Sequence, residues 1–352
     1  MEKGGNRMRR LQTIYTAVFT ACLIAFSVYA LLDTFVITRV YTVVEQETEE
    51  QSISRETLAA HTNGIPEGRG KGARPGKPEK RTDQDETRHG SEQTTAITET
   101  VKDDLNETAD SPAPISDSYS SDTVQIELTE YREYDSTIYV ADIMLKDAGA
   151  LKTAFAQNSF GRNVTADTSD TAAAVGAILA INGDNYGSRQ EGYVIRNGVL
   201  YRETAAKGQE DLVIYADGHF EIIREDEISA RELIANGAVQ VFSFGPGLIE
   251  EGEITVDLTE EVDRAKASNP RTAIGIIEEG HYVLVVSDGR TEESEGLTLY
   301  ELAVFMKELG AQTAYNLDGG GSSTMVFQGS VVNSTTSGRD NGERAVTDII
   351  YI

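Results

Sequence analysis

The chain has one cysteine, Cys22, among its 352 residues. Residues 23–352 therefore have no thiol pair for an internal disulfide or a thiolate zinc site. Histidine is also scarce, because only His219 and His281 lie beyond residue 123, which disfavours histidine-rich metal sites and most Ser-His triads. Positive charge is in short supply: 31 Lys and Arg stand against 58 Asp and Glu, for a net charge of −27. Such an acidic protein is not expected to coat nucleic acid.

An uncharged segment near the N-terminus is long enough to cross a membrane. Leu11–Leu32 holds 22 residues without a charge, and a helix of ~1.5 Å per residue would span ~33 Å, about one bilayer core. Basic residues precede the segment and Asp33 follows it, so the positive-inside rule places residues 1–10 in the cytoplasm and the rest outside. We expect a basic cytoplasmic tail over 1–10 and a transmembrane signal anchor over 11–32. Val28-Tyr29-Ala30 also fits a cleavage site, so removal of the anchor stays open.

The next segment, 33–123, has the composition of a linker. It is rich in Glu, Thr, Ser and Gly and poor in aromatic residues, so it cannot bury enough apolar surface to offset the entropy lost on ordering. Its basic patch at 69–81 reads more simply as a solvated stretch of mixed charge than as a binding site. We expect a flexible extracellular stalk here, followed by one folded domain over 124–352.

Short apolar runs separated by turns fill residues 124–352. Asn197-Gly198 and Asp217-Gly218 join neighbouring runs as the turns of two-residue hairpins do, which predicts antiparallel pairing. The pattern predicts an α+β domain with a mixed, largely antiparallel sheet and a few flanking helices. Strands are expected at 124–128, 137–144, 177–181, 193–195, 199–201, 212–216, 219–223, 239–244, 272–277, 281–287, 313–317, 325–327 and 345–352.

Two capping boxes predict where helices of the domain begin. Ser229-Ala-Arg-Glu232 opens a helix that should end at Gly237, and Thr298-Leu-Tyr-Glu301 opens one that should end at Gly310. In the second helix apolar residues recur at helical spacing, which predicts one face turned to the core.

Three of the apolar runs lead into polar, glycine-rich loops. They contain Asn182 with Asp184, Asp288 with Gly289, and Asp318 followed by Gly319-Gly320-Gly321-Ser322-Ser323. Three consecutive glycines cost backbone entropy, but they suit a backbone that approaches a ligand closely and points its N–H groups at an anion. Asp-Gly pairs are common in plain turns, which is our interpretation of Asp217-Gly218; for Asp318 we favour a functional loop.

Arg271 is the candidate anion ligand outside these loops. It follows Asn269-Pro270 and begins an apolar run, and proline fixes the backbone that leads into it. Its guanidinium suits phosphate or carboxylate, although it could equally neutralise a neighbouring carboxylate of this acidic chain. Arg339 and Arg344, in the loop 334–344, are further candidates.

Taken as a set, these sequences resemble the phosphodiester glycosidase family, which includes the mammalian uncovering enzyme. The resemblance rests on five segments: Ala180–Gly187 with Gly192–Tyr201, Phe242–Pro246, Asn269–Gly275, Ser287–Arg290 with Glu295–Thr298, and Tyr315–Met325. It extends over 124–352 and is strongest to bacterial members associated with exopolysaccharide. Gly183-Asp184-Asn185-Tyr186 stands where many members carry Gly-Gly-Phe-Phe, which adds a carboxylate to the site and leaves the sugar open.

The resemblance implies hydrolysis of a sugar-1-phosphodiester through an oxocarbenium-like transition state, with a phosphate leaving group that needs little acid assistance. It assigns the phosphate to Arg271 and to the backbone and hydroxyls of 319–323. Catalytic roles fall to Asp318, Asp184 and Asp288, with Asp318 or Asp184 as base or nucleophile, while Asn182 orients a sugar hydroxyl or the water. The expected substrate is a surface glycan or an exported polysaccharide outside the cell membrane.

Two other interpretations of the same residues stay open. A carbohydrate- or wall-polymer-binding ectodomain without activity would use the same glycines, hydroxyls and arginine. A divalent cation, Ca²⁺ or Mg²⁺, could be held by Asp184 and Asp288, because these ions take hard oxygen ligands; no other cofactor is expected. The clustering of three aspartates near an anion favours an enzyme.

Overall fold

The computed structural model describes residues 2–40, 116–259, 268–337 and 342–352. Its first element is helix α1, Glu2–Phe35, which includes the predicted span. Within it the window Tyr15–Leu32 has a mean hydropathy of 1.9 and is long and apolar enough to cross a membrane. Most of the predicted stalk, with its basic patch at 69–81, lies outside the described residues.

One eight-stranded sheet forms the centre of the domain, in the order β14-β13-β17-β15-β16-β4-β3-β2. Its strands come from both ends of the domain, because β4 near the start pairs with β16 near the end. The bounds are β2 Ser116–Ser120, β3 Val124–Glu133, β4 Ser136–Leu145, β13 Gly247–Glu250, β14 Glu253–Ile254, β15 Arg271–Glu278, β16 His281–Ser287 and β17 Thr313–Asn316.

Two five-stranded sheets accompany it. The first has the order β11-β10-β12-β8-β9 and the second the order β19-β18-β7-β20-β5. Their bounds are β5 Lys152–Phe155, β7 Leu179–Asn182, β8 Val194–Arg196, β9 Val199–Arg202, β10 Glu210–Tyr215, β11 Phe220–Arg224, β12 Ala238–Phe242, β18 Met325–Phe327, β19 Ser330–Val331 and β20 Asp348–Tyr351. A two-stranded pair joins β1 Arg39–Val40 to β6 Gly161–Arg162.

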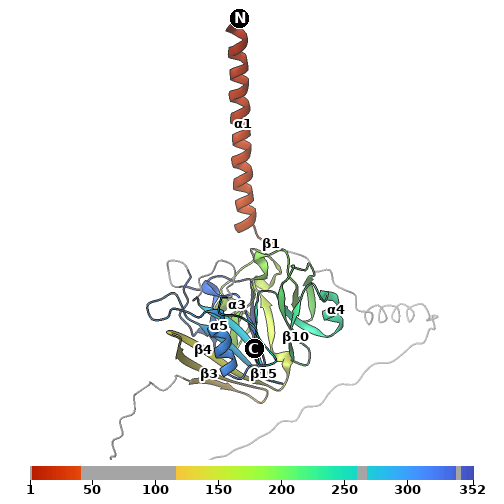
Figure 1. Ribbon diagram of the computed structural model, residues 1–352, viewed down its shortest axis with the longest axis vertical. Coiled ribbons are helices and arrows are strands. Elements are labelled where there is room, and N and C mark those ends of the chain that lie inside the picture. Colours follow the sequence, from red (N-terminus) through yellow and green to blue (C-terminus); the bar gives the residue numbers. More distant parts are fainter. Residues whose placement is uncertain (1, 41–115, 260–267, 338–341) are drawn as a thin grey trace, which may run out of the picture. The chain divides into compact units, whose positions relative to one another are not determined.

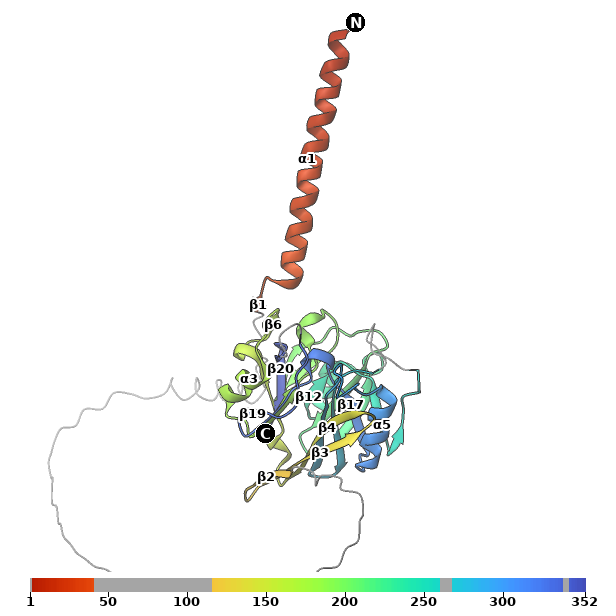
Figure 2. The same ribbon diagram turned by 90° about the vertical axis from the view of Figure 1, so that its left-hand side faces the viewer.

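Three helices cover the outer faces of these sheets, as Figures 1 and 2 show for α5 beside β4. Helix α5 packs its buried side chains on one face of the large sheet. Helix α4 lies on the first small sheet and α3 on the second. Their bounds, with the short 3-10 helices, are α3 Thr168–Val175, α4 Ala230–Ala235, α5 Leu299–Glu308, η1 Ala148–Ala150, η2 Ala156–Asn158, η3 Tyr186–Ser188 and η4 Gly320–Ser322.

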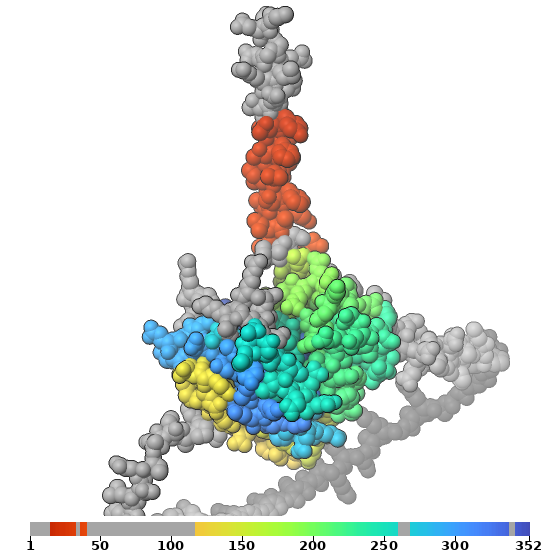
Figure 3. Space-filling model, viewed as in Figure 1, coloured from red at the N-terminus to blue at the C-terminus, as the bar shows by residue number. Residues whose placement is uncertain are grey.

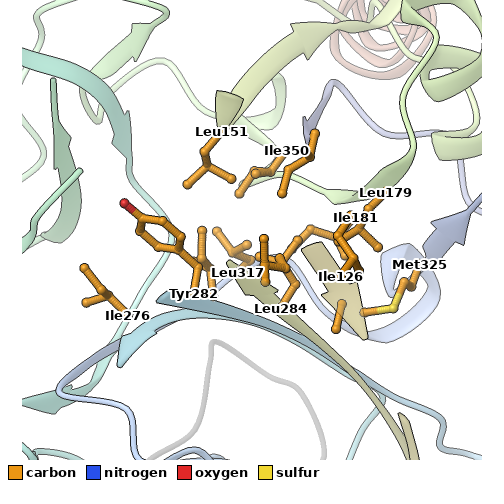
Figure 4. Packing of buried hydrophobic residues seen from close by; sticks show 14 of the residues in the cluster. Ile126, Leu151, Leu179, Ile181, Ile276, Tyr282, Leu284, Leu317, Met325 and Ile350 are labelled. Atoms are coloured by element: carbon orange, nitrogen blue, oxygen red, sulfur yellow. The ribbon is translucent and has the colours of Figure 1, made fainter. Parts of the chain in front are cut away.

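The main core lies between the large sheet and the inner faces of the two small sheets. Along β16, Tyr282 and Leu284 point into this core while Val283 and Val285 point toward α5, because successive strand residues face opposite sides. Figure 4 shows Leu284 packed among side chains from both kinds of sheet, including Ile181 of β7. Two buried faces explain why this strand is apolar at almost every position.

On the surface, elements distant in the sequence become neighbours. Figure 3 shows blue residues of the α5 region between the yellow residues of the β3–β4 hairpin and the teal and green residues of the middle of the domain. The loops that lead out of these strands are therefore brought together although the sequence separates them widely.

The local sequence signals are confirmed. The pairs Asn197-Gly198 and Asp217-Gly218 turn the antiparallel hairpins β8–β9 and β10–β11. Both capping boxes form: Ser229 with Glu232 opens α4, and Thr298 with Glu301 opens α5. Gly237 and Gly310 follow the two helices with positive φ of 95° and 92°, as helix ends favour.

Three features differ from the sequence prediction. All strand pairs among the described residues are antiparallel, so the sheets are more uniform than the expected mixed sheet. Strand β2 extends the large sheet by pairing with β3, which places the start of the folded domain before residue 124. Strands β5, β6, β13, β14 and β19 were not predicted from the sequence. Helix α3 was not predicted either; it is short and has no side-chain cap from Asp167.

Candidate functional site

Asn182, the last residue of β7, ties three segments together. Its Oδ1 accepts from the Thr272 hydroxyl at 2.9 Å and from the Thr324 amide at 3.2 Å. Its Nδ2 donates to the Asp318 carbonyl at 2.6 Å. The side chain is fully buried, so the amide fixes the position of the triple-glycine loop rather than meeting solvent.

The triple-glycine loop, Asp318–Ser323, lies directly against the segment that carries Arg271. The Gly320 amide donates to the Pro270 carbonyl at 2.8 Å. A Cβ at Gly319 would stand 2.8 Å from that same carbonyl, and one at Gly320, where φ is +63°, would stand 2.9 Å from the Arg290 guanidinium. Close approach of the backbone therefore requires glycine at 319, whereas at 320 the positive φ favours it.

Asp318 lies at the centre of this loop, 7% exposed. Its carboxylate accepts from the Ser322 hydroxyl at 2.6 Å and from Arg344 Nη2 at 3.1 and 3.3 Å. Burial raises the pKa of Asp318, while Arg344 and the Ser322 hydrogen bond oppose the rise. The net result is a raised pKa for the Asp318 carboxyl, and the Arg344 guanidinium limits the rise.

Three arginines from separate segments surround the loop. Arg271 is buried and donates from Nε to the Leu297 carbonyl at 2.9 Å. Arg290 is exposed and donates to Asn269 Oδ1 at 2.7 Å. Arg344 is also exposed and donates to Ser322 Oγ at 2.7 Å and to the Gly319 carbonyl at 3.1 Å. Guanidinium groups so placed suit the oxygens of a phosphate.

Arg290 also adopts a rare backbone conformation, with φ of +63°. This region is unfavourable for a residue with a side chain, and such residues are concentrated at functional sites. The conformation points the Arg290 guanidinium at Gly320. The positive φ of Arg290 is therefore a further indication, beside the three arginines, that the triple-glycine loop binds a ligand.

Two buried hydroxyls of the loop, Ser323 Oγ and Thr324 Oγ1, have no hydrogen-bond partner among the described residues. Leaving a buried hydroxyl unpaired costs about 1–3 kcal/mol. Both oxygens are closed off from solvent, so a bound molecule would reach them only if the loop moved.

Asp288 joins the same region through another segment. It follows β16, is 4% exposed, and accepts from the Ser334 amide at 2.8 Å. The adjacent Asn333 donates to the Ser323 carbonyl at 3.0 Å, so the segment 333–334 connects Asp288 to the triple-glycine loop. Burial raises the pKa of the Asp288 carboxyl.

Asp184 has a different environment from the other two aspartates. Its Oδ1 accepts from Arg196 Nη2 at 2.8 Å and its Oδ2 from the Ser243 amide at 2.8 Å. Arg196 also donates to Asp348 Oδ2 at 2.9 Å, and all three side chains are buried. The backbone stays close to the loop, since Gly183 accepts from the Asp318 amide at 3.3 Å, but the Asp184 carboxylate is engaged by Arg196.

A comparison with known proteins now identifies the family. A phosphodiester glycosidase family model matches residues 175–352, about half of the chain. The chain belongs to the phosphodiester glycosidase family. The match contains every residue of the site described above, from Asn182 to Arg344, while β2, β3 and β4 of the large sheet lie before it.

Two relatives of this family member are similar over part of their length. The chain is 34% identical over 182 residues to the SPbeta prophage-derived uncharacterized protein YomE of Bacillus subtilis (strain 168). The matched region covers 50% of this chain and 28% of that protein. The chain is 31% identical over 185 residues to the N-acetylglucosamine-1-phosphodiester alpha-N-acetylglucosaminidase of Mus musculus, covering 48% of this chain and 35% of that protein. The chain thus spans about a third of the length of these relatives.

The fold is also shared with a solved phosphodiester glycosidase. The catalytic domain of the zebrafish N-acetylglucosamine-1-phosphodiester alpha-N-acetylglucosaminidase superposes with a TM-score of 0.52 and 24% identity, over 69% of this chain and 84% of that chain. This similarity confirms the α+β architecture.

Sequence reasoning missed two residues of the buried cluster, Arg196 and Asp348. The available signal was a charged residue inside an otherwise apolar run, in Tyr193–Arg196 and again in Asp348–Tyr351. Among the described residues no group of three or more His, Cys, Asp or Glu side chains is placed to hold a metal ion. A divalent cation at Asp184 and Asp288 therefore stays a prediction.

Proposed function

We propose that the domain hydrolyses sugar-1-phosphodiester bonds at the Asp318 loop. One observation carries the proposal: the buried Asp318 carboxylate, the backbone of the three glycines that follow it and three arginines all meet at one loop. Family membership supports the same bond type. The substrate would be a glycan or exported polysaccharide outside the membrane.

The phosphate would be bound by the arginines and the loop. Arg290 and Arg344 present exposed guanidiniums beside Gly320 and Ser322, and the buried Arg271 supports the segment facing Gly319. Charge-assisted hydrogen bonds of this kind stabilise the charge that develops on a departing phosphate.

Asp318 would act at the anomeric carbon, as the base for a water or as the nucleophile. Because phosphate is a stable leaving group, the reaction needs little acid assistance and can proceed through an oxocarbenium-like transition state. We assign Asp288 to positioning the 333–334 segment beside the loop. Asp184 is assigned to holding Arg196, since both of its oxygens accept hydrogen bonds within the protein.

Helix α1 would anchor the domain in a membrane. Its apolar window, Tyr15–Leu32, follows a basic N-terminal stretch, which favours a cytoplasmic N-terminus and an extracellular domain. The mouse and zebrafish relatives are named for N-acetylglucosamine. We carry over the bond type and leave the sugar open, because Gly183-Asp184-Asn185-Tyr186 stands where the sequence resemblance leads us to expect Gly-Gly-Phe-Phe.

The substrate class can be tested with two matched compounds. One is a methyl ester of a sugar 1-phosphate, and the other is the methyl glycoside of the same sugar, which lacks the phosphate. The proposal predicts sugar release from the phosphodiester and at least ~10²-fold slower release from the glycoside, which offers no anion to the arginines. Equal rates on both compounds, or binding of the phosphodiester without release, would contradict it; the second result would favour a binding ectodomain.

The predicted divalent cation needs its own test. Because Arg196 and two backbone amides occupy the Asp184 carboxylate, a cation there would have to displace the arginine. Turnover with and without a chelator measures the dependence directly: a loss restored by Ca²⁺ or Mg²⁺ supports a cation, and an unchanged rate removes it from the proposal.

A further inference from the structure

A cavity of about 420 Å³, away from the Asp318 loop, is lined by several arginines although the protein is acidic. Arg162, Arg189 and Arg202 line it from β6, from the end of η3 and from β9, and Arg39 of β1 also lines it. Chance clustering would be unexpected in a chain of net charge −27.

Two of these arginines have only neutral contacts among the described residues. Arg202 donates from Nη1 to the Tyr186 carbonyl at 2.9 Å and to the Arg189 carbonyl at 2.8 Å. Arg189 donates from Nη1 to Gln209 Oε1 at 3.2 Å and lies over the Phe244 ring at 5.4 Å. Both side chains are partly buried, and burial lowers the pKa of Arg202. A cation removed from water without a contacting carboxylate favours an anion beside it.

Aromatic rings form the other wall of the cavity. Phe160 stacks on Tyr186 with centroids 5.0 Å apart, and Tyr201 lies 5.1 Å from Phe160. Burial raises the pKa of Tyr201, so at neutral pH its hydroxyl is a donor. Phe160 and Tyr186 are buried behind this wall, and the partly exposed Tyr201 offers the flat apolar surface on which the C–H face of a sugar packs. Guanidinium forks bind carboxylate or phosphate.

We propose that this cavity binds an acidic sugar unit, one that carries a carboxylate or a phosphate. The site is separate from the proposed catalytic loop, but one segment connects them. Gly183 accepts from the Asp318 amide at one end, and Tyr186 and Arg189 line the cavity at the other. A polymer with acidic units would thereby gain a second point of attachment.

Binding to the full-length, detergent-solubilised protein tests the proposal without relying on activity. The probes are glucuronate, glucose 6-phosphate and neutral glucose, measured by titration calorimetry. We expect at least one acidic sugar to bind at least ~10-fold more tightly than glucose, with affinity falling as salt rises. Tight binding of glucuronate alone would identify a carboxylate ligand, and tight binding of glucose 6-phosphate alone a phosphate. Absence of binding by both acids would overturn the proposal.

Matched variants locate the bound sugar. R189Q removes a cavity cation, whereas R231Q removes an exposed arginine that pairs with Glu203 outside the cavity. We expect an affinity loss of ~10-fold or more for R189Q and none for R231Q. Y201A removes a ring of the wall and should also weaken binding, which keeps the test valid if R189Q is unstable. Equal affinity in all three variants would refute the cavity as the site. Loss of glucose 6-phosphate binding in R344Q but not in R189Q would place the ligand at the catalytic loop, where Arg344 is the exposed cation, and overturn the proposal.

Discussion

The Asp318 loop and the Asp184–Arg196–Asp348 cluster use the same side-chain types in opposite settings. In the cluster, Arg196 is 1% exposed and its two carboxylate partners are 0% exposed. In the loop, the Arg344 side chain is 46% exposed and that of Asp318 10%. A sealed ion cluster holds strands together, whereas a guanidinium at the surface remains reachable by a substrate. Exposure, rather than residue type, therefore separates the buried Arg196 from Arg344, the arginine proposed to bind substrate.

The largest expected effect comes from breaking the sealed cluster. Arg196→Met leaves Asp184 and Asp348 buried without their shared cation, and removing one partner of a buried pair costs about 3–5 kcal/mol. Thermal unfolding should shift down by roughly 10 °C in a domain of this size. The matched variant Arg344→Met should lower stability by less than Arg196→Met, because Arg344 is half-exposed and Asp318 keeps its hydrogen bond from Ser322. Equal losses in both variants would remove the distinction between the two regions.

A smaller effect on rate is expected from Arg344→Gln. The neutral side chain no longer stabilises the Asp318 carboxylate, and the loss of an electrostatic contact of this kind typically slows catalysis by ~10²-fold. If Asp318 acts as an anion, activity falls as the pH drops through its raised pKa. Removing Arg344 raises that pKa further, so the acid limb of the pH–rate profile should move to higher pH. Arg224→Gln, outside the loop and paired with Glu210, should leave the acid limb in place; a limb unmoved in Arg344→Gln would contradict the coupling.

The smallest expected effect distinguishes the glycines. Gly319→Ala places a Cβ 2.8 Å from the Pro270 carbonyl, whereas the nearest atom to a Cβ at Gly321 is 3.5 Å away, in Ser337. The Gly319→Ala clash with the Pro270 carbonyl costs about 1–3 kcal/mol if the loop cannot move, so the loop is expected to shift away from Pro270. We expect that shift to lower kcat/KM by roughly tenfold, whereas Gly321→Ala should leave kcat/KM within about twofold. Steady-state kinetics of both variants would decide, and equal losses would show that backbone approach to Pro270 is not what the loop requires.

Local chemistry made much of the architecture predictable. The capping boxes at Ser229 and Thr298 and the Asn197-Gly198 turn act within a few residues, and the structure forms each of them. Strands β13 and β14 were missed although they join the large sheet. Both are short: β13 is defined by its pairing with β17, more than sixty residues later, and β14 by its pairing with β13. Pairing partners at that separation leave no periodic signal in the sequence.

Some residues of the site could also be predicted from the sequence, and others could not. Composition and family resemblance pointed to Asp318, its glycines and Arg271, and these residues are adjacent in the structure. The partner of Asp184 could not be foreseen, because Arg196 is recognised as structural only when its contact with Asp348, 152 residues away, is known. The catalytic assignments themselves stay predictions until they are measured.

The most direct test compares one chemical change in the two regions, D318N and D184N. Two measurements on each variant, kcat/KM on a sugar-1-phosphodiester and the unfolding temperature, distinguish a catalytic residue from one that stabilises the fold. We predict that D318N lowers kcat/KM by ~10³-fold or more with nearly unchanged unfolding, while D184N mainly lowers the unfolding temperature, because it weakens the pair with Arg196. Near-normal turnover by folded D318N would contradict the account.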